Sequence, residues 1–98
     1  MPMDAHRLVT PTSPSEWERF HRIRREVLFE ARGAFGVYDA EHPDDRAPHH
    51  YPKLLIHGRE PVGVVRIDVA GQVATLRRVA IRADCQRRGH GRALVTLA

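Results

Sequence analysis

The chain has 98 residues, of which 42% are hydrophobic and 29% charged, and its formal net charge is +4. A chain of this length supports one domain with a modest core, and it contains no apolar run near the ~20 residues that a membrane span requires. We therefore expect that the chain forms one domain and is not an integral membrane protein.

The N-terminal sequence and the number of cysteines predict the cellular compartment. Residues 1–6 show no basic segment followed by an apolar stretch, so no signal peptide is expected. The single cysteine, Cys85, excludes an internal disulfide framework and a cysteine-based zinc cluster. We expect a cytoplasmic protein in which Cys85 is a structural thiol.

Positive charge is concentrated in the last third of the chain. Residues 1–60 contain nine Lys or Arg against ten Asp or Glu, whereas residues 61–98 contain seven Arg against two Asp. The planar guanidinium of arginine suits phosphate oxygens better than the point charge of lysine. An anionic ligand is therefore expected near the C-terminal third.

The first predicted elements are a short strand over residues 6–10 and a long amphipathic helix. Ser13 is a candidate N-cap, Pro14 would occupy the first helical position, and Glu16 completes a capping box. We expect the helix to end at Gly33. Apolar residues recur at helical spacing on one face, namely Trp17, Phe20, Ile23, Val27 and Leu28.

Residues 33–51 form a polar connection that is interrupted by glycine and proline, and we expect about one helical turn within it. Connections of this length are often functional, and disorder is the rival interpretation. The connection contains several histidines, and another follows in the next strand. No pair of them has a spacing typical of metal ligands, so we expect solvated side chains and no metal site. These histidines are His42, His49, His50 and His57.

Three strands are predicted over residues 53–57, 62–69 and 73–81. The turns between them are short, so the strands should pair antiparallel. Gly63 lies inside the second of these strands and predicts a bulge or a close approach of the backbone.

The segment "CQRRGHGRAL", residues 85–94, follows the last strand and leads into a helix expected over residues 92–98. The first turn of a helix leaves N–H groups unpaired and carries the positive end of the helix dipole, so it attracts anions. Gly89 and Gly91 would let the backbone approach the anion, while Arg87, Arg88 and Arg92 would supply charge. The order strand, glycine loop, helix therefore predicts a phosphate site.

Two common phosphate loops do not match. A P-loop needs Gly-Lys followed by Ser or Thr, and the only lysine is Lys53. The dinucleotide fingerprint G-x-G-x-x-G fails because position 94 is Leu94 and the preceding strand is the last of four.

The pattern that does match is Gln/Arg-x-x-Gly-x-Gly/Ala, here Gln86 to Gly91. With "LRRVAIRADCQRRGHGRALV" around it, residues 76–95, the chain resembles the GNAT superfamily of N-acetyltransferases, and residues 23–45 are similar to the first-helix region of one GNAT branch. The resemblance implies an α/β (α+β) fold with a GNAT-like mixed sheet. Its element order is strand, helix, loop or short helix, three antiparallel strands, helix.

The resemblance also implies a site for acetyl-coenzyme A and an amine acceptor, which would be a small molecule or a peptide. The backbone of the last strand would hold the pantetheine arm and the loop would hold the pyrophosphate. No catalytic residue is assigned, because the last strand offers Thr75, Arg77 and Arg78 where the family often has an acidic residue. Asp68 and Glu30 are candidate bases only, and the role of an ordinary polar partner ranks above that of a base for each. The implied cofactor-binding residues are Val79, Ala80, Ile81, Gln86, Arg87, Arg88, Gly89, His90, Gly91, Arg92 and Ala93.

Family members continue with a fifth strand and a further helix, so residues 1–98 are expected to form one incomplete GNAT-like domain with its C-terminal half absent. The unpaired edge of the last strand would then favour partner pairing, a homodimer included.

Two alternatives to an acetyltransferase stay open. A non-catalytic acyl-CoA-binding or interaction domain would keep the cofactor slot without the chemistry. An arginine-rich nucleic-acid-binding module ranks lower, because the chain has few aromatic residues on which bases could stack.

Overall fold

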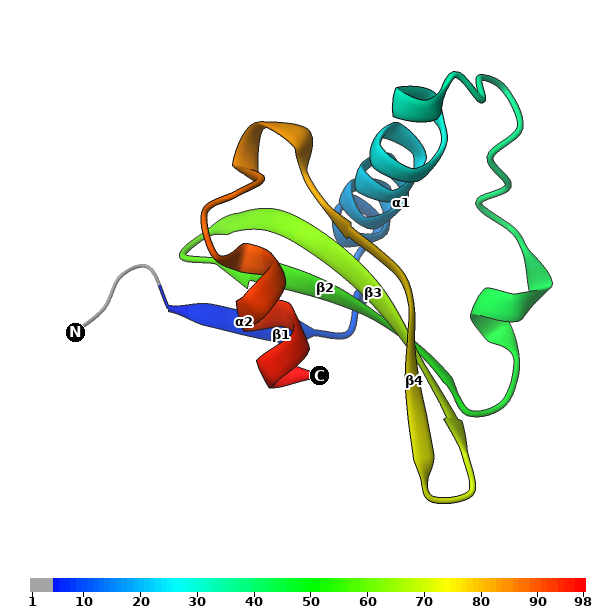
Figure 1. Cartoon of the computed structure of the whole chain (residues 1–98). Coiled ribbons are helices and arrows are strands. Elements are labelled where there is room, and N and C mark those ends of the chain that lie inside the picture. Colours follow the sequence, from blue (N-terminus) through cyan, green and yellow to red (C-terminus); the bar gives the residue numbers. More distant parts are fainter. Residues whose placement is uncertain (1–4) are drawn as a thin grey trace.

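The computed structural model describes residues 5–98 of the chain, so the signal-peptide expectation falls largely outside the described residues. Figure 1 shows a twisted sheet with one long helix on one side and a short helix on the other. The elements in chain order are β1 (His6–Val9), α1 (Pro14–Leu28), η1 (Glu30–Arg32), η2 (Pro43–Arg46), β2 (His50–His57), β3 (Glu60–Ala70), β4 (Val73–Ile81), η3 (Ala83–Cys85) and α2 (His90–Leu97). No helix among these is long and apolar enough to cross a bilayer.

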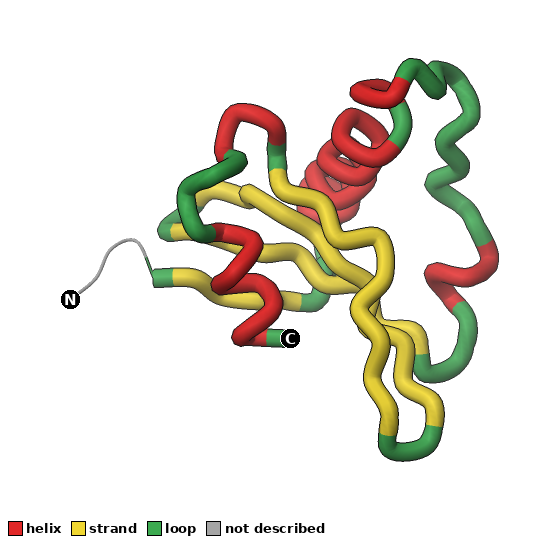
Figure 2. Tube along the Cα trace, viewed as in Figure 1, coloured by secondary structure: helices red, strands yellow, loops and turns green. Residues whose placement is uncertain are grey.

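The four described strands form one sheet in the order β1-β2-β3-β4, and each neighbouring pair is antiparallel. This confirms the predicted α+β order of elements and the antiparallel pairing of the three later strands. The hairpin of β3 and β4 extends well beyond the two main helices (Figure 2). Its tight turn is made by Gly71 with φ +59°, a conformation that favours glycine.

The start of α1 is formed as its sequence predicts. The Ser13 side chain accepts a hydrogen bond from the Glu16 backbone N–H at 3.1 Å, and the Glu16 carboxylate accepts one from the Ser13 backbone N–H at 3.1 Å. The end of the helix was predicted wrongly. The α-helix stops at Leu28, and the tighter η1 turn carries the chain on to Gly33, whose φ of +82° ends that turn.

Two apolar clusters lie on opposite faces of the sheet, because successive strand residues point to opposite faces. Phe20 and Ile23 of α1 pack on one face against Leu54, Ile56, Val64 and Ala80. Leu94 of α2 packs on the other face with Leu55, Val62, Val65 and Cys85. Cys85 is buried and forms no disulfide, which fits the structural thiol expected from sequence.

Other boundaries differ modestly from the predicted ones. β2 begins at His50 rather than at residue 53, and α2 begins at His90 rather than at residue 92. The η2 turn supplies the single helical turn expected in the long connection. The sequence did not predict the η3 turn after β4.

Gly63 lies where β3 and β4 approach each other closely, as its position within a strand predicted. A Cβ added there would lie 2.7 Å from Cδ1 of Ile81 and 3.0 Å from the carbonyl oxygen of Ala80. A register shift between Leu55 and Ile56 also falls opposite this part of β3. Gly63 therefore sets how close β4 lies to β3.

We expect Gly63→Ala to lower the free energy of unfolding by about 1–3 kcal/mol, the usual cost of overpacking a core. Urea unfolding of the variant measures this cost. Gly91→Ala is the matched control, because its added Cβ meets nothing within 4 Å and alanine favours helix. A Gly63→Ala protein as stable as wild type would show that β4 moves aside at no cost.

Candidate functional site

The outer edge of β4 is open within residues 5–98, because β4 pairs only with β3. Its register shifts so that Val64 faces Ala80 while Arg66 faces Arg77, which leaves an extra residue in β4. Arg78 lies at this bulge with φ +53°, in the left-handed region. The bulge bends β4 and leaves the backbone of residues 79–81 along the open edge, where an extended ligand could form strand-like hydrogen bonds.

The loop after β4 is fastened at its start by Arg82. The Arg82 guanidinium donates to the Asp84 carboxylate at 2.7 and 3.0 Å and to the carbonyl oxygen of Pro61 at 3.1 Å. The hydrogen bond from Arg82 holds the pKa of Asp84 below its usual value. The Gln86 side chain donates to the carbonyl oxygen of Ile81 at 3.1 Å, so it ties the loop to the strand end and does not point at a ligand.

The start of α2 presents unpaired backbone donors. Gly89 is the N-cap with φ +84° and no side-chain cap, and the first intrahelical bond runs from the Ala93 N–H to the Gly89 carbonyl oxygen. The N–H groups of residues 90–92 therefore find no acceptor in the described chain. A Cβ at Gly91 would face open space, so the approach to these donors is clear.

Three arginines flank this helix start in the sequence. Arg87, Arg88 and Arg92 are all exposed, and none takes part in an ion pair within residues 5–98. Arg87 adopts φ +65°. Positive charge, unpaired N–H groups and the positive end of the helix dipole thus occur in one short segment of the chain, and that combination suits a phosphate group.

His90 and Ala93 contribute to this site less directly than the sequence indicated. The His90 side chain is only 5% exposed and lies 2.8 Å from His6, measured from Nδ1 of His90 to Nε2 of His6. Burial, followed by the charges of His57, His6 and Arg88, lowers the pKa of His90. His90 therefore offers the loop its backbone N–H alone, and Ala93 lines a shallow groove along α2.

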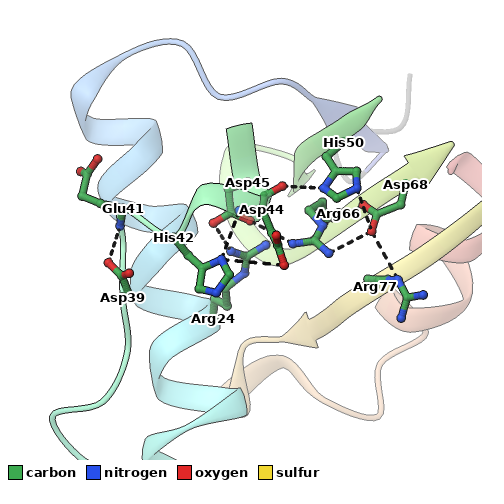
Figure 3. Close-up of polar contacts among 10 residues, drawn as sticks. All are labelled: Arg24, Asp39, Glu41, His42, Asp44, Asp45, His50, Arg66, Asp68 and Arg77. Carbon is green, nitrogen blue, oxygen red and sulfur yellow. Dashed lines mark hydrogen bonds and ion pairs between the residues drawn. The ribbon is translucent and has the colours of Figure 1, made fainter. Parts of the chain in front are cut away.

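A second polar group, which sequence analysis did not predict, lies on the α1 face of the sheet (Figure 3). We call it the charged network: Arg24, Asp45, Arg66 and Asp68, with Arg77 and His50 at its rim. Arg24 donates to Asp45 at 2.7 Å, and Arg66 donates to both oxygens of Asp68 at 2.7 and 2.9 Å. The side chains of Arg24, Asp45 and Arg66 are 1%, 7% and 5% exposed, so the contacts that Asp45 makes with both arginines are buried, and Asp68 is 14% exposed.

Helical spacing could have revealed one member of this network. Arg24 lies four residues after Phe20 and seven after Trp17, so it belongs to the apolar face of α1. A charged residue at such a position needs a buried partner. The partner, Asp45, comes from the long connection, and no local pattern in the sequence connects it with α1.

The rim of the charged network opens into a cavity of about 440 Å³. Its walls come from η2, from the start of β2 and from the two strands of the protruding hairpin. The lining residues are Asp44, His50, Arg66, Asp68, Val69, Ala70, Thr75 and Arg77.

Both candidate bases are already engaged. The Glu30 carboxylate pairs with Arg25 at 3.3 Å. Burial disfavours the charged form of Asp68, but the hydrogen bonds and charge of Arg66, with His50 and Arg77, outweigh it, so the pKa of Asp68 lies below its usual value. A carboxylate with a lowered pKa is a weak proton acceptor, so the structure presents Asp68 chiefly as an ionic partner of Arg66.

We expect Asp68→Asn to lower the free energy of unfolding by about 2 kcal/mol at pH 7, the scale of a hydrogen bond to a charged group. Because the folded-state pKa is depressed, this stabilisation is full above the unfolded-state value and is lost as pH falls through the folded one. Urea unfolding at pH 7, 5 and 3 should show the two proteins converging in acid. A pH-independent difference would contradict the ionic role.

Comparison with known proteins relates the chain to acetyltransferases. The sequence model of the Acetyltransferase (GNAT) family matches residues 14–98. No curated protein matches the chain significantly.

Solved structures share the fold. The ribosomal-protein-S18-alanine N-acetyltransferase from Escherichia coli superposes with a TM-score of 0.69 at 18% identity, covering 94% of this chain and 56% of that one. An acetyltransferase from Thermus thermophilus gives a TM-score of 0.69 at 26% identity, covering 98% and 68%. A GCN5-related N-acetyltransferase from Kribbella flavida gives 0.58 at 17%, covering 94% and 34%. The chain thus spans little more than half of the first of these structures.

Proposed function

The chain belongs to the GNAT family of acetyltransferases, and on that premise we propose that it transfers the acetyl group of acetyl-coenzyme A directly to a primary amine of a small molecule or peptide. One observation carries this proposal. The open edge of β4 leads into a helix start with unpaired N–H groups and three exposed arginines, a combination that suits a ligand with an extended arm and a pyrophosphate.

The residues present fit such a ligand. The backbone of Val79, Ala80 and Ile81 would bind the pantetheine arm, since Ala80 and Ile81 are paired with β3 on one side only. Residues 87–92 would bind the pyrophosphate through backbone N–H groups and guanidinium groups. Open space at Gly91 leaves room for the phosphate oxygens. When bound, acetyl-coenzyme A supplies an activated thioester as the acetyl donor.

The acceptor amine is best placed in the cavity beside the charged network. Two carboxylates, Asp44 and Asp68, and two arginines line this cavity, so its lining carries no net formal charge. Asp44 is the carboxylate that no arginine pairs among the described residues, so it is the group proposed to meet a cationic amine. The amine must lose a proton to attack the acetyl carbon as the carbon–sulfur bond breaks, and the departing thiolate gains one. No described carboxylate is both buried in this cavity and free of an arginine, so water is the proposed carrier of the amine proton.

A second candidate function is the binding of acyl-CoA without turnover, and the ion pairs of the two candidate bases favour it. Asp68 and Glu30 are both held in ion pairs, which is also what a domain that binds acyl-CoA without turnover would show. Such a domain would keep the loop geometry and lack an acetyl acceptor.

Two measurements on the full-length protein separate the two functions. Calorimetric titration with acetyl-coenzyme A tests the cofactor site, and release of free thiol in the presence of a panel of amines tests turnover. Binding with turnover supports the acetyltransferase, whereas binding without turnover for any amine supports the acyl-CoA-binding domain. Absence of binding by folded protein would overturn both, and salt-sensitive oligonucleotide binding would then favour the arginine-rich module.

A further inference from the structure

Three histidines from distant parts of the chain meet beneath the start of α2. They are His6 at the start of β1, His57 at the end of β2 and His90 in the first turn of α2, and we call them the histidine trio. One ring nitrogen of each lies within 4.8 Å of the other two. No other group of three His, Cys, Asp or Glu side chains with such a geometry occurs in residues 5–98.

Their meeting follows from the fold. His6 and His57 are direct partners in the antiparallel β1–β2 ladder, so their side chains project from the same face, and their rings stack with centroids 4.4 Å apart. Leu8 and Leu55, which are also paired, lie two residues farther along each strand and belong to the core on the α2 side. α2 packs on that same face beside β1 (Figure 1), which brings the His90 ring to centroid distances of 5.0 Å from His6 and 4.8 Å from His57.

We propose that the histidine trio is a binding site for a zinc-class divalent cation, with three imidazole ligands and a fourth position for water. Imidazole suits zinc, copper and nickel, and three protein ligands with one open position is an established coordination pattern for zinc. The cation would tie β1 and β2 to the start of α2, immediately behind the loop that presents the phosphate-binding groups.

The geometry needs only small adjustments. Two nitrogens bound tetrahedrally at zinc lie about 3.4 Å apart, given zinc–nitrogen bonds of about 2.0–2.1 Å. The 2.8 Å contact between His6 and His90 must lengthen slightly, and the widest separation of 4.8 Å must shorten by about 0.7 Å per ring. His6 and His57 are only partly buried, so their rings have room to rotate.

The protonation state also fits a cation. A hydrogen bond between Nε2 of His6 and Nδ1 of His90 requires that one of these nitrogens carries a lone pair.

Titration calorimetry of metal-stripped full-length protein with ZnCl₂ tests the site, with thermal unfolding as a second readout. We expect one equivalent of Zn²⁺ to bind and the melting temperature to rise with Zn²⁺ concentration. His57→Gln and His6→Gln should each weaken binding more than about tenfold, since even outer partners of metal sites contribute about 10–100-fold. Bound Co²⁺ should show the visible absorption of a tetrahedral site in wild type only.

His49→Asn is the matched control, because His49 is exposed, lies outside the trio, and has a φ of +65° that asparagine tolerates. It should leave Zn²⁺ affinity unchanged. Folded wild-type protein that binds no Zn²⁺, or Zn²⁺ affinity that survives in both trio variants, would overturn the proposal. These readouts record metal binding itself, so their outcome does not depend on whether the loop binds acetyl-coenzyme A.

Discussion

Gly91→Glu is expected to weaken the affinity for acetyl-coenzyme A at least about 100-fold while raising the free energy of unfolding. Both effects come from the same position, the second residue of α2. A carboxylate there interacts favourably with the helix dipole and glutamate favours helix over glycine, which together stabilise by about 1 kcal/mol. A Cβ at this position meets nothing within 4 Å, so the added side chain fits, and its negative charge beside the unpaired N–H groups would repel a pyrophosphate.

Calorimetric titration with acetyl-coenzyme A and urea unfolding measure the two effects separately. Gly91→Gln has the same shape without the charge, so it should lose less affinity, and its difference from Gly91→Glu should shrink as salt is added. Val73→Glu places the same charge at the exposed tip of the β3–β4 hairpin and should leave binding unchanged. A stable Gly91→Glu protein with wild-type affinity would place the cofactor elsewhere.

Local patterns predicted most of the fold. The capping box at Ser13 and Glu16, the short turns between the three later strands, and Gly63 each involve residues that are close in sequence or in the same ladder. The loop that joins β4 to α2 was expected for the same reason, because its glycines and the helix after it are close in sequence. Its role as an anion site stays a prediction. The end of α1 was predicted wrongly because Gly33 ends a 3₁₀ turn that follows the α-helix.

Long-range pairings were missed. Asp45 meets Arg24 across 21 positions, and His6 meets His90 across 84. Neither spacing belongs to a helix or a strand, so only the tertiary structure brings these groups together. For this reason no nearby ligand for His57 was apparent in the sequence, although its direct partner in the β1–β2 ladder is His6. Chemistry that depends on such pairings is visible only once the sheet order is known.

The second large effect is expected at Asp45, whose replacement by alanine should lower the free energy of unfolding by about 3–5 kcal/mol. Removing one member of a buried ion pair leaves the other charge uncompensated in the interior. Asp45 is the 2.7 Å partner of Arg24 and also lies 3.5 Å from Arg66. Within the described chain, Nε and Nη2 of Arg24 and Nη1 of Arg66 have no hydrogen-bond acceptor, so these guanidinium groups depend on Asp45 and Asp68 for their compensation. Small domains have total stabilities of about 5–15 kcal/mol, so this loss brings the protein close to unfolding.

Urea or thermal unfolding at neutral pH measures the loss, and Asp44→Ala is the matched control. The Asp44 side chain is 56% exposed and its carboxylate lies 3.9 Å from His42, so its removal should change stability by no more than about 0.5 kcal/mol. The double variant Arg24→Met, Asp45→Leu should recover much of what Asp45→Ala loses, because apolar side chains of similar volume remove the buried charge together with its partner. If Asp45→Ala and Asp44→Ala proved equally mild, the long connection would not be anchored to α1 through this ion pair, and the wall that it contributes to the acceptor cavity would have to be held by other contacts.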